Sequence, residues 1–370
     1  MIRLCLWLAA VAVALVPPAA RLPTAVVRDG ASADYFTQSF GCAAEEAAKA
    51  EKRLRGRFFE GKTRAKADEL CSWLQSALSL SDAELKKMVL EYPTLLSCTE
   101  KNLASTLDWL RSNLDLSKAE LKKLVRANPR ILGLSIEANM APKVKWLQSR
   151  LDLSMAELRK VLLRKSQVFS YNVEANLAPA FDWLQSTLNL RDSELKKLVV
   201  RNPSMLGYTP EARLANLEWL QKTLDLSDSE LRKTVLRAPM IITNSVEANM
   251  APKLKWFQSR LDLSTSELSK LVQAAPTVMN LSVETNLAPK IDWFEQELGL
   301  SVSDVRAKIL AMPICLTNSL TKRYQPRLEV CRVANVDPVV VLISTLTDED
   351  FCKRVGVPLE TLRAAQEDVS

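Results

Sequence analysis

Apolar and charged residues alternate along most of the chain with the spacing of an amphipathic helix. In the segment SKAELKKLVRANP (117–129), Leu121, Leu124 and Val125 are apolar and the intervening residues are mostly charged. Positions i, i+3 and i+4 share one face of an α-helix, so this pattern predicts a helix with one buried face. Ser117 and Glu120 form a capping box at its start, and the proline at 129 ends it. We call this predicted element helix A.

Helix A recurs along the chain. The capping pair returns as Ser81/Glu84, Ser154/Glu157, Ser227/Glu230, Ser264/Glu267 and, more weakly, Ser301/Asp304, and Arg191 interrupts it once. The proline returns as Pro93, Pro129, Pro203, Pro239, Pro276 and Pro313, with Ser166 in the one missing position. Tryptophans at 73, 109, 146, 183, 219, 256 and 293 keep the same period of 36–37 residues. Such a period predicts a solenoid, in which each unit stacks only on its neighbours.

A second helix completes each unit. The stretch EANMAPKVKWLQSR (137–150) returns almost unchanged as EANMAPKLKWFQSR (247–260). A proline deep inside a helix costs about 3 kcal/mol, so Pro142 is expected in the first turn of a new helix, with Asn139 as its cap. Asn249 has the same predicted role in the second copy, and Ser135 and Ser245 are predicted to cap a short turn before it. We call this second element helix B.

The predicted fold class is therefore all-α. Helix A, a tight turn, helix B and a short Leu-Asp-Leu connection make one unit of an α-solenoid superhelix, right- or left-handed. We place the repeat array at residues 61–355 and a C-terminal tail at 356–370. The VVVLI run at 339–343 is the first β-like signal, and we interpret it as the buried face of a C-terminal helix.

The N-terminal residues have a different pattern. Residues 4–16 are 13 consecutive apolar residues behind Arg3, and a helix of that length covers about 20 Å of a ~30 Å hydrocarbon core. We interpret residues 1–20 as a signal-peptide-like leader and the alanine-rich residues 21–60 as a targeting or linker segment without fixed structure. We expect no stable membrane span in the mature protein.

Composition excludes several kinds of site. The chain has 8 glycines and no histidine, which argues against a glycine-rich phosphate loop, a histidine base, a Ser-His-Asp triad and a histidine-containing zinc site. Its seven cysteines form no C-x-x-C pair, so we expect buried, reduced thiols. We therefore predict no enzyme activity, no metal, no cofactor and no small-molecule substrate. A net charge of +7 permits an anionic partner without requiring one.

Two neighbouring positions of helix A are almost always basic. Six residues before the proline position, with Ala307 as the exception, stand Lys87, Lys123, Lys160, Lys197, Lys233 and Lys270. Seven residues before it, with Ser269 as the exception, stand Lys86, Lys122, Arg159, Lys196, Arg232 and Arg306. We call these sets the outward column and the flank column, because they point about 200° and 100° away from the buried face.

Two further sets of cations accompany the columns. The C-terminal arginines, at the end of helix A, are Arg126, Arg164, Arg201 and Arg237. The post-proline lysines, at the start of helix B, are Lys143, Lys253 and Lys290. Stacking at about 10 Å per helix layer would align these charges into a stripe of about 60 Å, or about 18 base pairs. Such a stripe suits nucleic-acid binding.

Each set also has a local explanation. An acid stands nine residues before every proline position, so the outward lysines could form i,i+3 pairs on a solvated face, at about 0.2–0.5 kcal/mol each. This is the simpler interpretation of the outward column, and the flank column is the stronger binding candidate. Arginines at a helix C-terminus also favour the helix dipole. The tryptophans are expected to pack between units, with base stacking as the alternative.

The unit LDLSxxELKKLVxxxPxxL, followed by SxExNLxPKxxWL, resembles the mitochondrial transcription termination factor (mTERF) family. NSLTKRYQPRLEVCRV (318–333) and DEDFCKRV (348–355) resemble that family's terminal unit. The resemblance implies a curved superhelix of three-helix units with a positive concave groove for double-stranded nucleic acid. It also implies work in mitochondria or plastids, in transcription termination, initiation or RNA processing.

We therefore expect a monomer that binds organelle nucleic acid, with duplex DNA favoured and phosphate contacts from Lys and Arg. Near-identical units favour reading of shape or backbone over bases. The alternatives are an RNA-binding or RNA-processing factor and a protein-binding scaffold. The leader together with the resemblance favours a plastid reached through a signal and a transit peptide, with a mitochondrion as the alternative.

Overall fold

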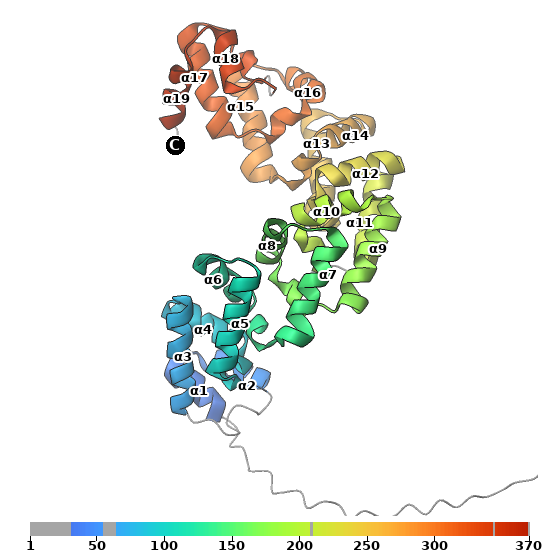
Figure 1. The fold of residues 1–370 in the computed structure, drawn as a ribbon. Helices are drawn as coiled ribbons and strands as arrows, with labels where there is room; N and C mark the ends of the chain where they lie inside the picture. The colour runs from blue at the N-terminus through green and yellow to red at the C-terminus, as the bar shows by residue number, and fades with distance from the viewer. Residues whose placement is uncertain (1–30, 55–63, 208–209, 343–344, 369–370) are drawn as a thin grey trace, which may run out of the picture. The chain divides into compact units, whose positions relative to one another are not determined.

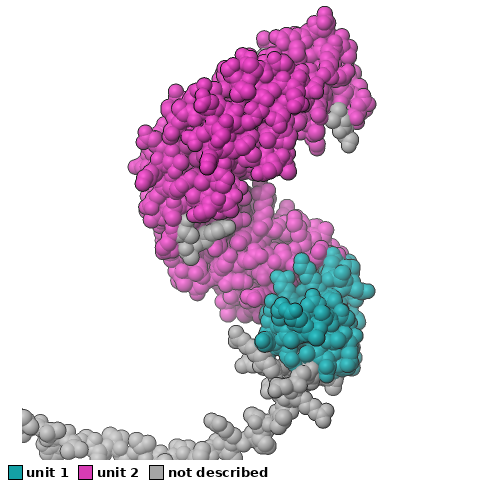
Figure 2. Space-filling view, turned by 180° about the vertical axis from the view of Figure 1, so that it is seen from behind, with its two compact units in different colours: residues 1–105 teal, residues 106–370 magenta. Residues whose placement is uncertain are grey.

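The computed structural model describes residues 31–54, 64–207, 210–342 and 345–368, so the predicted leader lies outside the described residues. Those ranges hold nineteen α-helices and no strand, which confirms the all-α prediction. The chain divides into two compact units, Met1–Ser105 and Thr106–Ser370 (Figure 2). Among the described residues, no helix combines the length and the apolar character that a membrane crossing requires.

Helix A of every repeat is found where the pattern predicts it. These helices are α4 (Asp82–Glu91), α6 (Lys118–Ala127), α8 (Met155–Arg164), α10 (Asp192–Arg201), α12 (Asp228–Arg237), α14 (Thr265–Ala274) and α16 (Val302–Ala311). The capping boxes form as predicted, for example with the Ser117 N–H donating to Glu120 at 3.0 Å and the Glu120 N–H donating to Ser117 Oγ at 3.2 Å. At Arg191 the side chain has no acceptor, and Glu194 still accepts from the backbone N–H at 2.9 Å.

The proline position both ends helix A and begins a 3₁₀ helix. These short helices are η1 (Pro93–Ser97), η2 (Pro129–Gly133), η4 (Ser166–Ser170), η6 (Pro203–Gly207), η7 (Pro239–Ile242), η9 (Pro276–Asn280) and η11 (Pro313–Thr317). A further 3₁₀ helix, η13 (Pro338–Leu342), also begins with a proline but does not follow a helix A. A proline suits the first position of a helix, where its missing N–H has no partner to lose. The VVVLI run therefore lies largely in a 3₁₀ helix, with Val341 and Leu342 buried.

Helix B follows. Its copies are α3 (Arg64–Leu78), α5 (Glu100–Asn113), α7 (Ala141–Leu151), α9 (Ala178–Leu188), α11 (Pro210–Leu224), α13 (Ala251–Leu261), α15 (Ala288–Leu298) and α17 (Gln325–Ala334). A π-helical turn precedes five of them, as η3 (Ile136–Met140), η5 (Val173–Leu177), η8 (Val246–Met250), η10 (Val283–Leu287) and η12 (Leu320–Tyr324).

The predicted asparagine caps are wrong. Asn139 and Asn249 lie inside the π turns, and no side chain caps the helices that follow. Ser135 is the cap instead, since its hydroxyl accepts from the Ala138 N–H at 3.0 Å. The π turn lets the helix run continuously from Ile136 into α7, because its i→i+5 bonds end just before Pro142, which has no N–H to donate.

The connection from helix B to helix A turns on one left-handed residue. A residue just after each helix B has positive φ: Ser79, Asp115, Asp152, Asn189, Asp225, Asp262, Gly299 and Asn335. Asp, Asn and Gly tolerate this conformation better than other residue types. The Leu-Asp-Leu connection is therefore a left-handed helix C-cap between two buried leucines.

The helices of the second unit form two layers. Each helix A contacts the next along the series α6, α8, α10, α12, α14 and α16, which gives a continuous row (Figure 1). Tryptophans of helix B are half-buried, and two of them stack across successive repeats. The Trp146 ring lies 5.4 Å from that of Phe181, and the Trp293 ring lies 6.0 Å from that of Tyr324. These contacts agree with the packing interpretation.

Two segments outside the predicted repeat array are helical. Residues 31–54, expected to be linker, form α1 (Ala31–Phe40) and α2 (Ala44–Leu54), because Tyr35 and Phe36 are fully buried. The predicted tail forms most of α19 (Leu359–Glu367), which follows α18 (Asp348–Val355) and packs on α17 through the buried Leu362. Both segments bury apolar residues that were too few to show a period in the sequence.

Candidate nucleic-acid interface

The outward column is exposed. All six lysines, Lys87, Lys123, Lys160, Lys197, Lys233 and Lys270, are solvent-exposed on helix A. None forms an ion pair in the described part of the chain, so the expected i,i+3 pairs with the acids of the capping box are not made. These ammonium groups remain available to a ligand.

The flank column is occupied by contacts between repeats. Arg159 donates to the Asp115 carbonyl at 2.7 Å, and Lys196 donates to the equivalent Asp152 carbonyl at 2.5 Å. The same cations pair with the capping-box glutamate of the preceding repeat: Lys196 with Glu157 at 3.0 Å, Arg232 with Glu194 at 2.6 Å and Arg306 with Glu267 at 2.8 Å. In the first unit, Lys86 donates to the Gly41 carbonyl at 3.1 Å. The flank column, which the sequence favoured as the binding candidate, is therefore the set whose cations are bonded within the protein.

These pairs leave the glutamates strongly acidic. Hydrogen bonds from Arg191, followed by one from Arg232, lower the pKa of Glu194 to about 2. Hydrogen bonds from Ser264, followed by one from Arg306, lower the pKa of Glu267 to about 2. Each carboxylate therefore stays ionised and is neutralised locally, so it repels an approaching anion less than a free acid would.

The C-terminal arginines lie on the same exposed face as the outward column. Arg164, Arg201 and Arg237 each donate one bond to a carbonyl at the end of the next helix A, at 3.3, 3.1 and 3.0 Å. They remain exposed and keep further donors.

These arginines also stand four residues after an outward lysine. The pairs are Lys160/Arg164, Lys197/Arg201 and Lys233/Arg237. Like charges at i,i+4 oppose helix stability by about 0.2–0.5 kcal/mol. The arginines have a role in stacking the repeats, but the outward lysines make no ion pair in the described part of the chain that would offset this cost.

The post-proline lysines are buried. Lys143, Lys253 and Lys290 are 4%, 3% and 1% exposed, which corrects their assignment as nucleic-acid contacts. Each ammonium group bonds to an asparagine four residues earlier and to a carbonyl of the next 3₁₀ helix, at 2.5 Å for Lys143 with Phe169 and at 2.7 Å for Lys253 with Met279. Burial lowers the pKa of Lys290 to about 8. These lysines hold successive repeats together.

The arginines that end the duplicated stretches at 137–150 and 247–260 also form contacts within the protein. Arg150 donates to Gln185 at 2.6 Å, and Arg260 pairs with Glu295 at 2.6 Å and with Asp292 at 2.9 Å. All of these partners lie on the next helix B. The duplicated stretch is therefore concerned with stacking of repeats.

Sequence reasoning missed cations in the first unit. Arg53 on α2 donates to the Leu90 carbonyl at 2.7 Å, as Arg164 does to Arg201, and it stands ten residues after Ala43 as Arg164 does after Ser154. Glu46 accepts from the Ala43 N–H at 3.3 Å, which is half of a capping box. Residues 41–54 thus carry a further, degenerate helix A. The glutamate three residues after Ala43 was the available signal.

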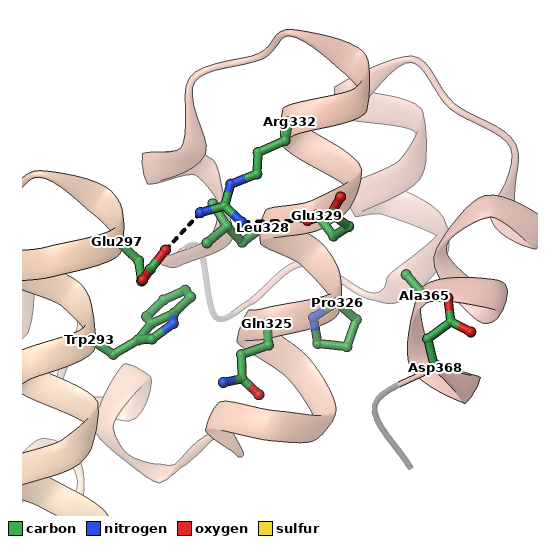
Figure 3. A pocket seen from close by; sticks show the side chains of 9 residues that line it. All are labelled: Trp293, Glu297, Gln325, Pro326, Leu328, Glu329, Arg332, Ala365 and Asp368. Carbon is green, nitrogen blue, oxygen red and sulfur yellow. Dashed lines mark hydrogen bonds and ion pairs between the residues drawn. The ribbon is translucent and has the colours of Figure 1, made fainter.

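The C-terminal helices present a different surface. A cleft of about 460 Å³ lies over α17, between α15 and α19 (Figure 3). Arg332 bridges Glu297 at 2.7 Å and Glu329 at 3.5 Å, and Trp293 lines one side (Figure 3). Asp368 adds a third carboxylate. This acidic cleft is unsuited to a phosphate backbone.

The protein-family model described as mTERF matches residues 69–352. No curated protein matches the chain in sequence. The matched range covers helices α4 to α17 in full, and it excludes α1 and α2.

Proposed function

Because the chain belongs to the mTERF family, whose members bind nucleic acid in organelles, we propose that it regulates organelle gene expression by binding duplex DNA. The contacts come from the outward column and the C-terminal arginines. Transcription termination is the preferred role and a plastid the preferred organelle.

The three i,i+4 cation pairs on α8, α10 and α12 carry this proposal. They lie on successive helices in contact, they are exposed, and the acids of the same helices are confined to the capping ends. A row of exposed cations suits the phosphates of nucleic acid, since phosphate contacts supply most sequence-independent affinity.

The lack of exposed tryptophan and tyrosine rings in the described residues favours a duplex over a single strand. Single-stranded nucleic acids are usually bound by stacking bases on exposed aromatic rings. In the described residues, every tryptophan and tyrosine is buried or half-buried. A surface with cations and no stacking platform suits a paired backbone better than unpaired bases.

A salt titration of binding tests the proposal. The substitutions Lys160→Ala, Lys197→Ala and Lys233→Ala together should flatten the slope of log K against log salt on duplex DNA by about 2.7. At 0.1 M salt, this loss of three contacts corresponds to a drop in affinity of about 500-fold. Filter binding with duplex DNA, single-stranded RNA and heparin measures both quantities.

Two matched triple variants serve as controls. Lys308→Ala, Lys353→Ala and Arg363→Ala remove three exposed cations of the C-terminal helices and should leave the slope unchanged. Arg159→Ala, Lys196→Ala and Arg232→Ala together should lower the melting temperature, because these residues pair within the protein. They should change the slope of log K against log salt less than the three outward substitutions do. A wild-type slope near zero would contradict phosphate binding, and a preference for RNA would favour the RNA-binding alternative.

A further inference from the structure

One position of the flank column departs from the others. Ser269 on α14 stands where the other repeats carry lysine or arginine. As a result Glu230, the capping-box glutamate of the preceding repeat, makes no ion pair in the described part of the chain, whereas Glu157, Glu194 and Glu267 each have a cation from the next repeat. One oxygen of Glu230 accepts from Ser227, at 2.9 Å from the backbone N–H and 2.6 Å from the hydroxyl. The capping interaction is therefore intact, and only the neutralising cation is missing.

A cleft lies beside this carboxylate, and Glu230 is part of its lining. It has a volume of about 360 Å³ and lies between α12 and α14. Its lining consists of Glu230, Lys233, Thr234, Arg237, Lys270, Gln273 and Ala274. Two outward lysines and one C-terminal arginine thus border the cleft, so it opens on the same face as the proposed phosphate contacts.

The cleft has the chemistry of a base contact rather than of a phosphate contact alone. A carboxylate would repel a phosphate but accepts a hydrogen bond from the exocyclic amine of cytosine. Gln273, whose amide donates to Ser269 Oγ at 3.1 Å, adds a neutral donor and acceptor of the kind that reads adenine. The bordering cations can hold the phosphates on either side of that base.

We propose that the cleft between α12 and α14 reads one base of the bound nucleic acid through its exocyclic amino group. Glu230 accepts from the amine, Gln273 contacts the same edge, and Lys233, Arg237 and Lys270 hold the flanking phosphates. The other repeats read the backbone only. This inference rests on the proposed nucleic-acid binding and assigns sequence preference to a single joint between repeats.

Selection from a random duplex pool tests the inference, with the wild type compared with Ser269→Lys. The new lysine has ready partners, because the equivalent Lys196 bonds to Asp152 and Glu157, and the matching residues here are Asp225 and Glu230. We expect the wild type to select a sequence with one required C or A, and the variant to lose that requirement without losing affinity. Thermal unfolding should show the variant at least as stable as the wild type.

Controls separate the cleft from a general effect of charge. Gln258→Lys adds the same charge to an exposed position of α13, outside the cleft, and should keep the requirement. In the selected duplex, exchanging C for T or A for G replaces the amine with a carbonyl oxygen and should weaken wild-type binding by about 5- to 150-fold. Whichever exchange weakens binding identifies the base.

The outcomes are distinguishable. Absence of nucleic-acid binding by the wild type would overturn the proposed function and this inference together. Binding without any base requirement would overturn the inference alone. A requirement that persists in Ser269→Lys would place sequence reading elsewhere and would also overturn it.

Discussion

Helices α12 and α16 have the same length, the same capping box and the same 3₁₀ continuation, yet they present different side chains to solvent. Where α12 carries the exposed Lys233 and Arg237, α16 carries Ala307 and Ala311. The helix therefore forms without these two cations, and Arg237 also bonds to the Gln273 carbonyl of the next helix A. The outward lysine has no such contact, so its presence on six repeats and its absence from α16 indicate a surface requirement.

The same contrast extends to whole regions. Residues 118–274 contain 25 basic and 16 acidic residues, and residues 288–370 contain 10 basic and 12 acidic residues. Within one repeat architecture, the first region is suited to a polyanion and the second is not. Net charge thus differs between the two regions, whereas the contacts that stack the repeats are of the same kind in both.

The buried lysines give the largest expected effect and test what the two regions share. Lys253 lies in the basic region and Lys290 in the acidic one, and each is bonded to the next 3₁₀ helix. Lys253→Met and Lys290→Met should each lower the free energy of unfolding by about 2–3 kcal/mol, because a buried carbonyl loses its donor. Urea denaturation measures this, with Lys233→Ala as a neutral control. A large loss of stability for only one of the two variants would show that the two regions do not share this stacking contact.

An intermediate effect is expected from transferring a cation between regions. Ala307→Lys places an outward lysine on α16, next to α14 with its Lys270. One added phosphate contact should raise affinity for duplex DNA about eightfold at 0.1 M salt. Ala307→Gln is the uncharged control. Equal affinity for the two variants would mean that the interface ends before α16.

The smallest effect concerns the one proline position that holds serine. Ser166 is buried, its hydroxyl has no hydrogen-bond partner among the described residues, and it begins a 3₁₀ helix as proline does elsewhere. Ser166→Pro should stabilise the protein by about 0.4–1 kcal/mol by restricting the unfolded chain. The melting temperature is the measurement, and Ser170→Pro, at the other end of the same 3₁₀ helix, is the contrast. A lower melting temperature for Ser166→Pro would show that the backbone conformation at this position differs from that of the repeats that carry proline.

Features set by near neighbours were predictable from the sequence. The helix A boundaries and the capping boxes depend on residues three to five apart, and the structure confirms them. The left-handed residue after helix B was also available, as Asp, Asn or Gly recurring with the period. It was described only as a short connection.

The availability of each cation was not predictable, because it depends on partners in the next repeat. Arg232 and Lys233 are neighbours in sequence, yet one pairs with Glu194, 38 residues earlier, and the other is exposed. Lys143 and Lys145 differ in the same way, since only Lys143 is buried. An asparagine four residues before each buried lysine was the one local signal.

The stacking contacts run forward along the chain, which bears on how the protein is made. Lys143 bonds to a carbonyl 26 residues later, and Glu157 is neutralised by Lys196, 39 residues later. A ribosome adds about 5–20 residues per second, so a newly made repeat waits about 2–8 seconds for its last partner. During synthesis, the most recently completed repeat is therefore always the least stable one, and a chain stopped early ends in a repeat with an open carboxylate and an unsatisfied lysine.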